Sequence, residues 1–282
     1  MRTKNVLPAG MLPASRMNWL FFFYPELDQG TIKINNLTIS EEINYIIIGA
    51  NGFIGKKILS HLSGANIIAI GRSNSHTQIG NEKYYSIHKF SLDQIANSNS
   101  GLKCIVIDLS YASVSNVSVK DPARDFADNI NLVINNLKFA RAIGAVKYIY
   151  MSSGGAVYGR SMDGQIDEFH ATNPISHYGI IKLASENYVR MFCESNEIDY
   201  NIIRPSNVYG PGQIPFRGQG IIATALGAAI SHSSISIFGT GDNVRDYIYI
   251  DDFCNWLVAL SVKGKAREIY NAGSGQGYSI FE

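Results

Sequence analysis

The chain has 282 residues, of which 46% are hydrophobic and 17% charged, and its formal net charge is +1. Such a composition is typical of a globular protein with one large core and room for a smaller lobe. The near-neutral charge argues against a nucleic-acid partner, and no apolar run reaches the roughly 20 residues of a membrane span. Three dispersed cysteines and six histidines show no metal-ligand spacing, so we expect buried reduced cysteines, no metal site and a cytoplasmic location.

The chain divides by composition near residue 43. Residues 1–42 combine three prolines with the apolar run WLFFFY, and we interpret them as an N-terminal extension outside the main fold. The predicted elements after it are a strand at 45–48, a helix at 54–62, strands at 67–70 and 102–107, a helix at 125–143, a strand at 148–151, a helix at 178–193 and a strand at 200–204.

Continuous apolar strands that alternate with helices predict an α/β fold, with a parallel sheet covered on both faces. The expected fold class is a Rossmann-type doubly wound sheet with a small, truncated C-terminal substrate lobe. We assign 43–205 to a domain that binds NAD or NADP, and 206–282 to a partial substrate-binding lobe interleaved with the core.

The segment GANGFIG at 49–55 lies directly between the first strand and the first helix. Its first glycine permits the tight turn, the second lets backbone N–H groups approach a pyrophosphate at the helix N-terminus, and the third lets helix and strand pack closely. The expected cofactor contacts in this loop are Gly49, Asn51, Gly52, Phe53, Ile54 and Gly55.

The end of the second strand bears on the choice between NAD and NADP. An acidic residue there would bind the adenosine ribose of NAD, but this chain has Gly71 followed by Arg72. Arg72 can pair with the 2′-phosphate of NADP through its guanidinium donors, or it can be a solvated surface arginine. The sequence therefore leaves both cofactors open.

Tyr178 and Lys182 stand four residues apart on one predicted helix and therefore share a face. A tyrosine ionises near pH 10 on its own, and a neighbouring ammonium stabilises the phenolate. We expect Tyr178 to act as a general acid and base whose pKa Lys182 brings toward neutral pH.

Five segments resemble the extended short-chain dehydrogenase/reductase superfamily, in its NAD-dependent epimerase/dehydratase family. They occur in the family's order and the resemblance covers residues 45–282. The segments are GANGFIG (49–55), SSGGAVYG (152–159), PISHYGIIK (174–182), RPSNVYGPGQ (204–213) and VRDYIYIDD (244–252).

The resemblance implies roles for individual residues. Tyr178 would exchange a proton with the sugar, and Lys182 would also hold the nicotinamide ribose. Leu109 and Ser110 would line the cofactor, and Pro205 would lie near the nicotinamide.

The resemblance also places Asn207 and Arg245 at the diphosphate of a nucleotide sugar. The alternatives are loop capping for Asn207, and for Arg245 an internal salt bridge with Asp251 or Asp252. Asn131 corresponds to an asparagine that is structural in relatives.

Three departures from the family pattern qualify this resemblance. Gly154 stands where relatives place a catalytic Ser or Thr, so we assign that role to Ser153, with Ser152 as the alternative. Tyr111 is bulkier than the small residue expected after the fourth strand. The sequence also ends where relatives continue, so part of the sugar pocket would be missing.

The predicted function is a nucleotide-sugar epimerase acting on a UDP-hexose through a transient 4-keto sugar. One alternative is an NADPH-dependent reductase of nucleotide-linked 4-keto sugars, which Arg72 favours. Another is a dinucleotide-binding protein with little catalysis, which Gly154 and the early end favour. A homodimer through the helices that carry Asn131 and Tyr178 is possible by analogy with relatives.

Overall fold

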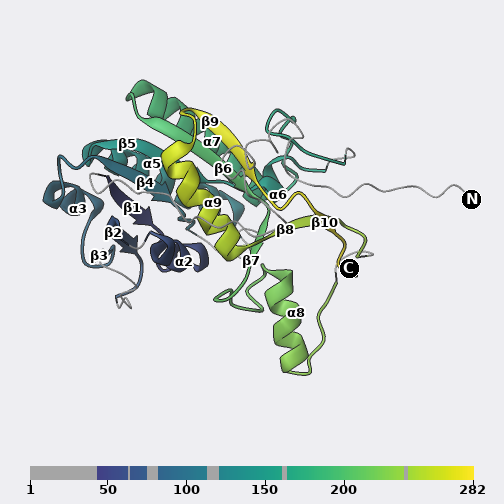
Figure 1. Ribbon diagram of the computed structural model, residues 1–282. Coiled ribbons are helices and arrows are strands. Elements are labelled where there is room, and N and C mark those ends of the chain that lie inside the picture. The colour runs from purple at the N-terminus through teal and green to yellow at the C-terminus, as the bar shows by residue number, and fades with distance from the viewer. Residues whose placement is uncertain (1–42, 63, 75–81, 113–120, 161–163, 238–240) are drawn as a thin grey trace, which may run out of the picture.

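The computed structural model describes residues 43–62, 64–74, 82–112, 121–160, 164–237 and 241–282. The predicted extension at 1–42 lies outside the described residues. A central sheet with helices on both faces makes up most of the described chain (Figure 1). The predicted α/β fold class is confirmed.

The central sheet has seven strands in the order β3-β2-β1-β4-β5-β6-β9, and every neighbouring pair is parallel. Strand order reverses between β1 and β4, the arrangement of a doubly wound fold. The strands are β1 (Asn44–Ile48), β2 (Asn66–Gly71), β3 (Lys83–Ser86), β4 (Cys104–Asp108), β5 (Ala145–Met151), β6 (Asp199–Pro205) and β9 (Glu268–Ala272).

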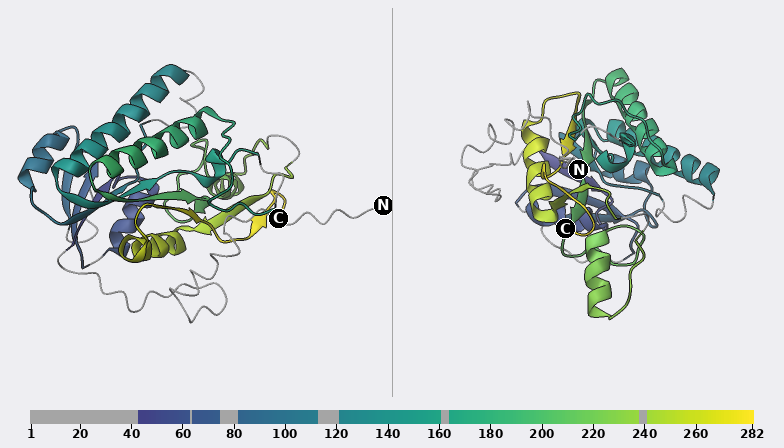
Figure 2. Two further views of the ribbon diagram at one scale, coloured as in Figure 1. Left: turned by 90° about the horizontal axis from the view of Figure 1, so that it is seen from above. Right: turned by 90° about the vertical axis from the view of Figure 1, so that its right-hand side faces the viewer.

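Two helical layers cover the sheet, because strands that are apolar on both sides must bury both faces (Figure 2). Helices α2 (Phe53–His61) and α9 (Ile250–Lys263) cover one face. Helices α3 (Leu92–Ser98), α5 (Pro122–Ala142) and α7 (His177–Ser195) cover the other. The three cysteines are buried and free, as predicted.

The start of α7 is set by a local capping interaction. The hydroxyl of Ser176 accepts a hydrogen bond from the Gly179 amide at 3.1 Å, which satisfies a donor of the first turn. Tyr178 is therefore held in the first helical turn, and Lys182 follows it one turn later on the same side.

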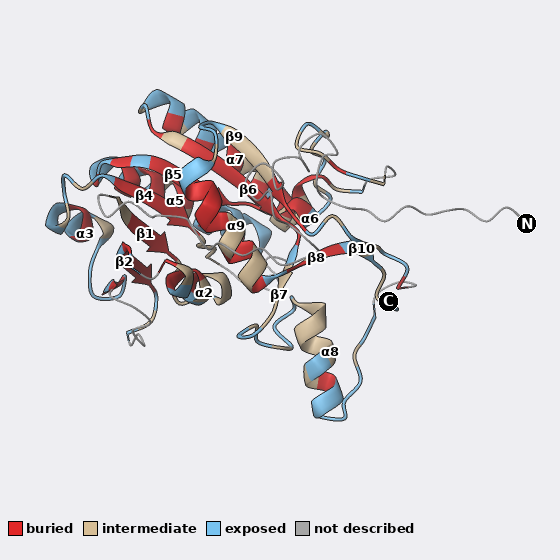
Figure 3. Ribbon diagram, viewed as in Figure 1, coloured by how far each residue is buried: buried red, intermediate tan, exposed pale blue. Residues whose placement is uncertain are grey.

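A second, smaller sheet lies beyond the carboxyl end of β6. It contains β7 (Asn207–Tyr209), β8 (Arg245–Tyr249) and β10 (Gly277–Tyr278), with β7 parallel and β10 antiparallel to β8. Helix α8 (Ile221–Ile230) projects away from the central sheet, and only Ala228 of this helix is buried (Figure 3). This lobe is therefore much more exposed than the core.

Candidate active site

The predicted site residues of the core gather at one edge of the central sheet. Because all its strands are parallel, the loops after β1, β2, β4, β5 and β6 leave from the same edge. Gly49, Arg72, Leu109, Ser153 and Pro205 each lie at or just beyond one of these strand ends. This edge is where doubly wound folds bind their ligands.

The glycine loop fits a dinucleotide. Gly49 has φ +88°, and a Cβ there would lie 3.1 Å from the backbone carbonyl of Leu109. A Cβ at Gly55 would lie within 2.2 Å of the Gly49 oxygen, so only glycine allows α2 to pack this closely on the loop. Gly52 begins α2 without a side-chain cap, so the first-turn amides, including those of Phe53 and Ile54, face no capping side chain.

Asn51 interacts with the end of β2. Its Oδ1 accepts hydrogen bonds from the Tyr84 hydroxyl at 2.7 Å and from the Ser73 amide at 3.4 Å. A Cβ at Gly71 would clash with the Asn51 side chain. Glycine at position 71 therefore gives Asn51 the space in which it links the glycine loop to β2.

Arg72 is exposed, and its guanidinium reaches from the end of β2 to the loop after β4. Its Nη1 donates to the Ala112 carbonyl at 3.2 Å. Among the described residues no carboxylate forms an ion pair with Arg72. Its remaining donors therefore have no anionic partner in this part of the chain.

Leu109 and Ser110 follow β4 directly beside the glycine loop. The Leu109 amide donates to the Ile48 carbonyl at 2.9 Å, which ties the ends of β4 and β1 together. The Ser110 amide and hydroxyl both donate to Asp108 Oδ1, at 2.9 and 2.6 Å. The backbone of this segment is thus fixed at the point where strand order reverses.

Tyr178 is half-buried and lies against two side chains from other elements. Its ring packs edge-on against Tyr111, with ring centroids 5.1 Å apart. Burial raises the pKa of Tyr178 to about 12, and a hydrogen bond with Ser153 opposes that rise. The structure therefore brings Ser153, rather than Gly154 or Ser152, to the phenol.

Lys182 is buried, and its ammonium donates to the Met151 carbonyl at 2.7 Å and to the Tyr150 hydroxyl at 3.4 Å. The ammonium lies 5.9 Å from the centre of the Tyr178 ring. Burial lowers the pKa of Lys182 to about 8. For Tyr178 the effect of burial on the pKa is larger than that of the opposing hydrogen bond with Ser153. The effect expected from Lys182 on this pKa stays a prediction.

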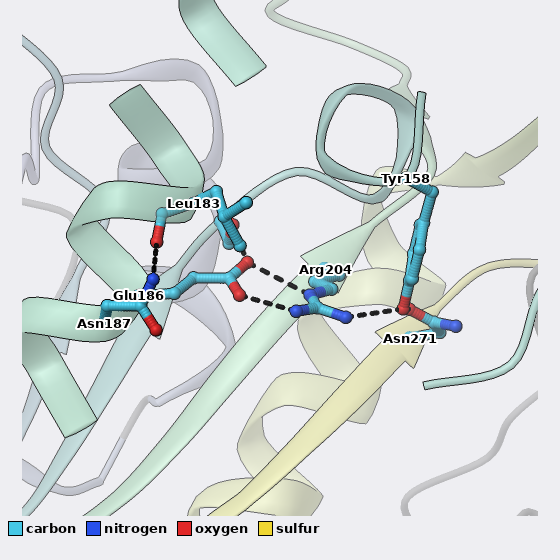
Figure 4. A network of polar contacts seen from close by, with 7 residues as sticks. Tyr158, Leu183, Glu186, Asn187, Arg204 and Asn271 are labelled. Carbon is cyan, nitrogen blue, oxygen red and sulfur yellow. Dashed lines mark hydrogen bonds and ion pairs between the residues drawn. The ribbon is translucent and has the colours of Figure 1, made fainter. Parts of the chain in front are cut away.

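A buried polar network joins Glu186, Arg204 and Tyr158 (Figure 4). Glu186, one turn after Lys182 along α7, forms a two-pronged pair with Arg204 of β6, with contacts of 3.0 and 2.6 Å. The Ser152 hydroxyl donates to the same carboxylate at 2.5 Å, and Arg204 donates to the Tyr158 hydroxyl at 2.9 Å. Ser152 therefore takes part in this buried network through Glu186 and is not the serine that contacts the Tyr178 phenol.

The residues predicted to bind substrate lie on the small sheet. Asn207 pairs with Tyr247 across β7 and β8, so Asn207 and Arg245 lie on the same face. Both are exposed. The Asn207 amide donates to the Asp246 carbonyl at 2.9 Å, and Arg245 donates to the Val244 carbonyl at 2.9 Å.

Among the described residues Arg245 forms neither of the alternative salt bridges, with Asp251 or with Asp252. Asp251 pairs with Lys57 and His61 instead, at 2.7 and 2.9 Å. Within the described ranges no carboxylate lies within ion-pair distance of Arg245. Its guanidinium therefore remains available to an anion.

The structural role expected for Asn131 is a wrong prediction. Asn131 is exposed on α5, whereas Asn129 and Asn136 are buried. Asn129 accepts from the Ala112 amide at 2.8 Å, and Asn136 donates to Asp108 at 2.9 Å. The helical periodicity, which places 129, 133 and 136 on the inner face, identifies the correct asparagines.

In the part of the chain that the structure describes, no helix is both long and apolar enough to cross a bilayer. Nor do three or more metal-binding side chains come together there.

The doubly wound sheet, the glycine loop at its switch point, and Tyr178 and Lys182 on one helix face are the features of a short-chain dehydrogenase/reductase. A profile of the NAD dependent epimerase/dehydratase family matches residues 45–273. The chain belongs to this family. The family's description agrees with the predicted cofactor, NAD or NADP.

Three similar proteins of known or assigned activity illustrate the range of the family. A putative UDP-glucose 4-epimerase of Methanocaldococcus jannaschii is 32% identical over 84% of this chain and 79% of its own length. A UDP-glucose 4-epimerase of Mycolicibacterium smegmatis is 30% identical over 82% of this chain and 77% of its own length. A dTDP-4-dehydro-6-deoxyglucose reductase of Escherichia coli is 29% identical over 83% of this chain and 78% of its own length.

Solved structures with the same arrangement include the Thermotoga maritima UDP-glucose 4-epimerase bound to UDP-glucose. It superposes with a TM-score of 0.75 at 29% identity, over 84% of this chain and 79% of that one. The Thermus thermophilus UDP-glucose 4-epimerase in complex with NAD gives a TM-score of 0.73 at 25% identity, over the same shares.

Proposed function

We propose that this chain is a nucleotide-sugar 4-epimerase that acts on a UDP-hexose. The observation that carries the proposal is the assembly of Tyr178, Ser153 and Lys182 at the sheet edge that also holds the glycine loop. Similarity to two UDP-glucose 4-epimerases supports the sugar and the nucleotide. The reaction would pass through a 4-keto sugar.

In this proposal Tyr178 removes the proton from the sugar 4-hydroxyl. It returns the proton after the 4-keto sugar has rotated and presented its other face to the nicotinamide. Ser153 donates a hydrogen bond to the reacting oxygen, and Lys182 holds the nicotinamide ribose. When bound, the nicotinamide supplies reversible hydride transfer. The protein contributes proton transfer and orientation.

The base role of Tyr178 depends on charge in its surroundings. With a pKa of about 12, its phenol is protonated at neutral pH unless the phenolate is stabilised. The Lys182 ammonium, which lies 5.9 Å from the ring centre, would stabilise that phenolate. We therefore expect proton abstraction to require Lys182 in its charged form.

Asn207 and Arg245 would bind the diphosphate of the substrate. Both lie on one face of the small sheet, which they share with Tyr209 and Tyr247, whose ring centroids lie 6.5 Å apart. A guanidinium without a carboxylate partner is suited to a diphosphate, which accepts two parallel hydrogen bonds.

The test of this function is incubation of the purified protein with UDP-glucose and either NAD or NADP, followed by chromatography of the nucleotide sugars. We expect UDP-galactose to accumulate toward a fixed ratio from either direction. No interconversion with bound cofactor would refute the epimerase proposal. Cofactor binding without any turnover would favour the alternative of a binding protein.

A reductase of nucleotide-linked 4-keto sugars is the second candidate. The raised pKa of Tyr178 favours it, because a protonated phenol is ready to donate to a ketone. The exposed Arg72 and the similarity to an E. coli reductase favour it as well. Consumption of NADPH with a 4-keto sugar nucleotide, faster than consumption of NADH, would select this function.

We also propose a homodimer through the outer faces of α5 and α7. Phe126 on α5, and Ile180 and Met191 on α7, are exposed apolar side chains on these two adjacent helices. Their burial in a dimer would remove apolar surface from water. Light scattering that gives the mass of a single chain at micromolar concentration would contradict this assembly.

A further inference from the structure

Lys182 belongs to a cluster of four buried ionisable side chains, with Asp108, Glu186 and Arg204. Glu186 and Arg204 neutralise each other through their two-pronged contact. The cluster is then left with one positive charge, on Lys182, and one negative charge, on Asp108. Because a buried charge is costly unless another charge compensates it, the question is whether Asp108 compensates Lys182.

Asp108 is fully buried at the end of β4, and all its hydrogen-bond partners are neutral. Ser110 donates twice to Oδ1, while Asn136 and Tyr148 donate to Oδ2 at 2.9 and 2.5 Å. Across the described ranges no cation lies within ion-pair distance of this carboxylate. Four hydrogen-bond donors therefore surround this carboxylate.

Lys182 likewise touches only neutral groups. Its ammonium contacts the Met151 carbonyl and lies 4.9 Å from the ring centre of Tyr111 and 5.0 Å from that of Tyr150. The charged or titratable groups that face it are Asp108 from β4, Tyr111 from the following loop, Tyr150 from β5, and Tyr178 and Glu186 from its own helix.

Asp108 lies on the same side of the sheet as Lys182. Along β4, Cys104 and Val106 pack under the α5 and α7 layer, and Asp108 continues this alternation. Asp108 is also directly opposite Tyr150 in the neighbouring strand, and the Lys182 ammonium lies over that ring. Of the two carboxylates that keep the pKa of Lys182 from falling below about 8, Asp108 has the larger effect.

We propose that Asp108 is a positioning residue of the active site, whose buried negative charge keeps Lys182 in its ammonium form. This inference rests on the proposed function, in which a charged Lys182 stabilises the Tyr178 phenolate. The hydrogen bonds from Ser110 also make Asp108 the anchor of the segment that carries Tyr111 to the phenol.

The test compares two variants that alter the same network. Asp108→Asn removes the negative charge, whereas Tyr148→Phe removes one hydrogen bond to Asp108 and leaves the charge. The readout is the titration of Lys182 by NMR of ¹³Cε-labelled lysine, with the resonance assigned by its loss in Lys182→Arg. It needs neither substrate nor turnover, so it is independent of whether the chain is an epimerase.

We expect Asp108→Asn to lower the pKa of Lys182 by about one pH unit and Tyr148→Phe to leave it near the wild-type value. In a turning-over enzyme, the alkaline limb of kcat would move to lower pH by the same amount, because Lys182 would lose its proton earlier. An unchanged Lys182 titration in Asp108→Asn, or an equal change in Tyr148→Phe, would overturn the proposal.

If Asp108→Asn alone does not fold, a double variant decides the question. Asp108→Asn with Lys182→Met removes both charges of the pair, so it should fold and be more stable than Asp108→Asn alone. A double variant that is no more stable than the single one would contradict mutual compensation. Absence of sugar turnover with the expected lysine titration would instead count against the proposed function alone.

Discussion

The central core and the small lobe prepare their functional side chains in opposite ways. In the core, Lys182 is buried and Tyr178 half-buried; both lie against Tyr111 of the loop after β4, and Lys182 also lies over Tyr150 of β5. In the lobe, Asn207 and Arg245 are exposed, and their side chains donate to carbonyls of the same small sheet. In the proposed function, the groups for the chemical step would therefore be arranged before substrate binds, whereas the groups that bind the diphosphate would be completed by the ligand.

The largest expected effect comes from the core. Tyr178→Phe removes the hydroxyl that exchanges the proton and keeps the ring against Tyr111, so we expect kcat to fall by about 10³-fold with cofactor binding retained. Steady-state turnover and cofactor titration measure the two effects. Tyr188→Phe, on the exposed side of the same helix, is the matched control and should keep wild-type turnover.

Ser153→Ala tests whether the core has replaced the hydroxyl missing at Gly154. Loss of one donor to the reacting oxygen should lower kcat by about 100-fold, with KM nearly constant. Because its hydrogen bond lowers the pKa of Tyr178, the variant should also shift the pH profile toward higher pH. Wild-type kcat in Ser153→Ala would remove Ser153 from the mechanism.

The lobe should respond differently. Arg245→Leu should raise KM for the nucleotide sugar by about 10- to 100-fold, because it removes charge-assisted hydrogen bonds to the diphosphate, with a smaller change in kcat. Stability should be unchanged, since Arg245 is exposed and its guanidinium donates to the carbonyl of the adjacent Val244. Arg141→Leu, an exposed change at the end of α5, controls for loss of charge. A fall in kcat alone would contradict the division between the two regions.

Local sequence patterns predicted the parts of the fold that depend on contacts between residues close together in the sequence. Continuous apolar runs identified five of the central strands, and the glycine loop identified the cofactor edge. The same patterns missed β3 and β9. They also did not show that α9 covers the core sheet while α8, from the same C-terminal part of the chain, projects away from it.

The site residues also divide into those that local sequence patterns predicted and those that they missed. Tyr178 and Lys182 were recognisable from their spacing on one helix, and the same spacing extended by one turn reaches Glu186. Asn131 was the wrong asparagine because a family pattern does not fix which side chain faces inward. Asp108 had a signal of its own, as a carboxylate that ends a strand otherwise apolar throughout.

By itself the sequence determined the α/β class, the dinucleotide loop and the shared helical face of Tyr178 and Lys182, because these depend on contacts over a few residues. Tertiary structure decided that Ser153 meets the phenol, that Glu186 pairs with Arg204, and that Asp108 remains as the charge opposite Lys182. These contacts join different strands and helices. Because water is excluded around them, their charges interact more strongly than they would in solvent, and a local sequence pattern does not predict this.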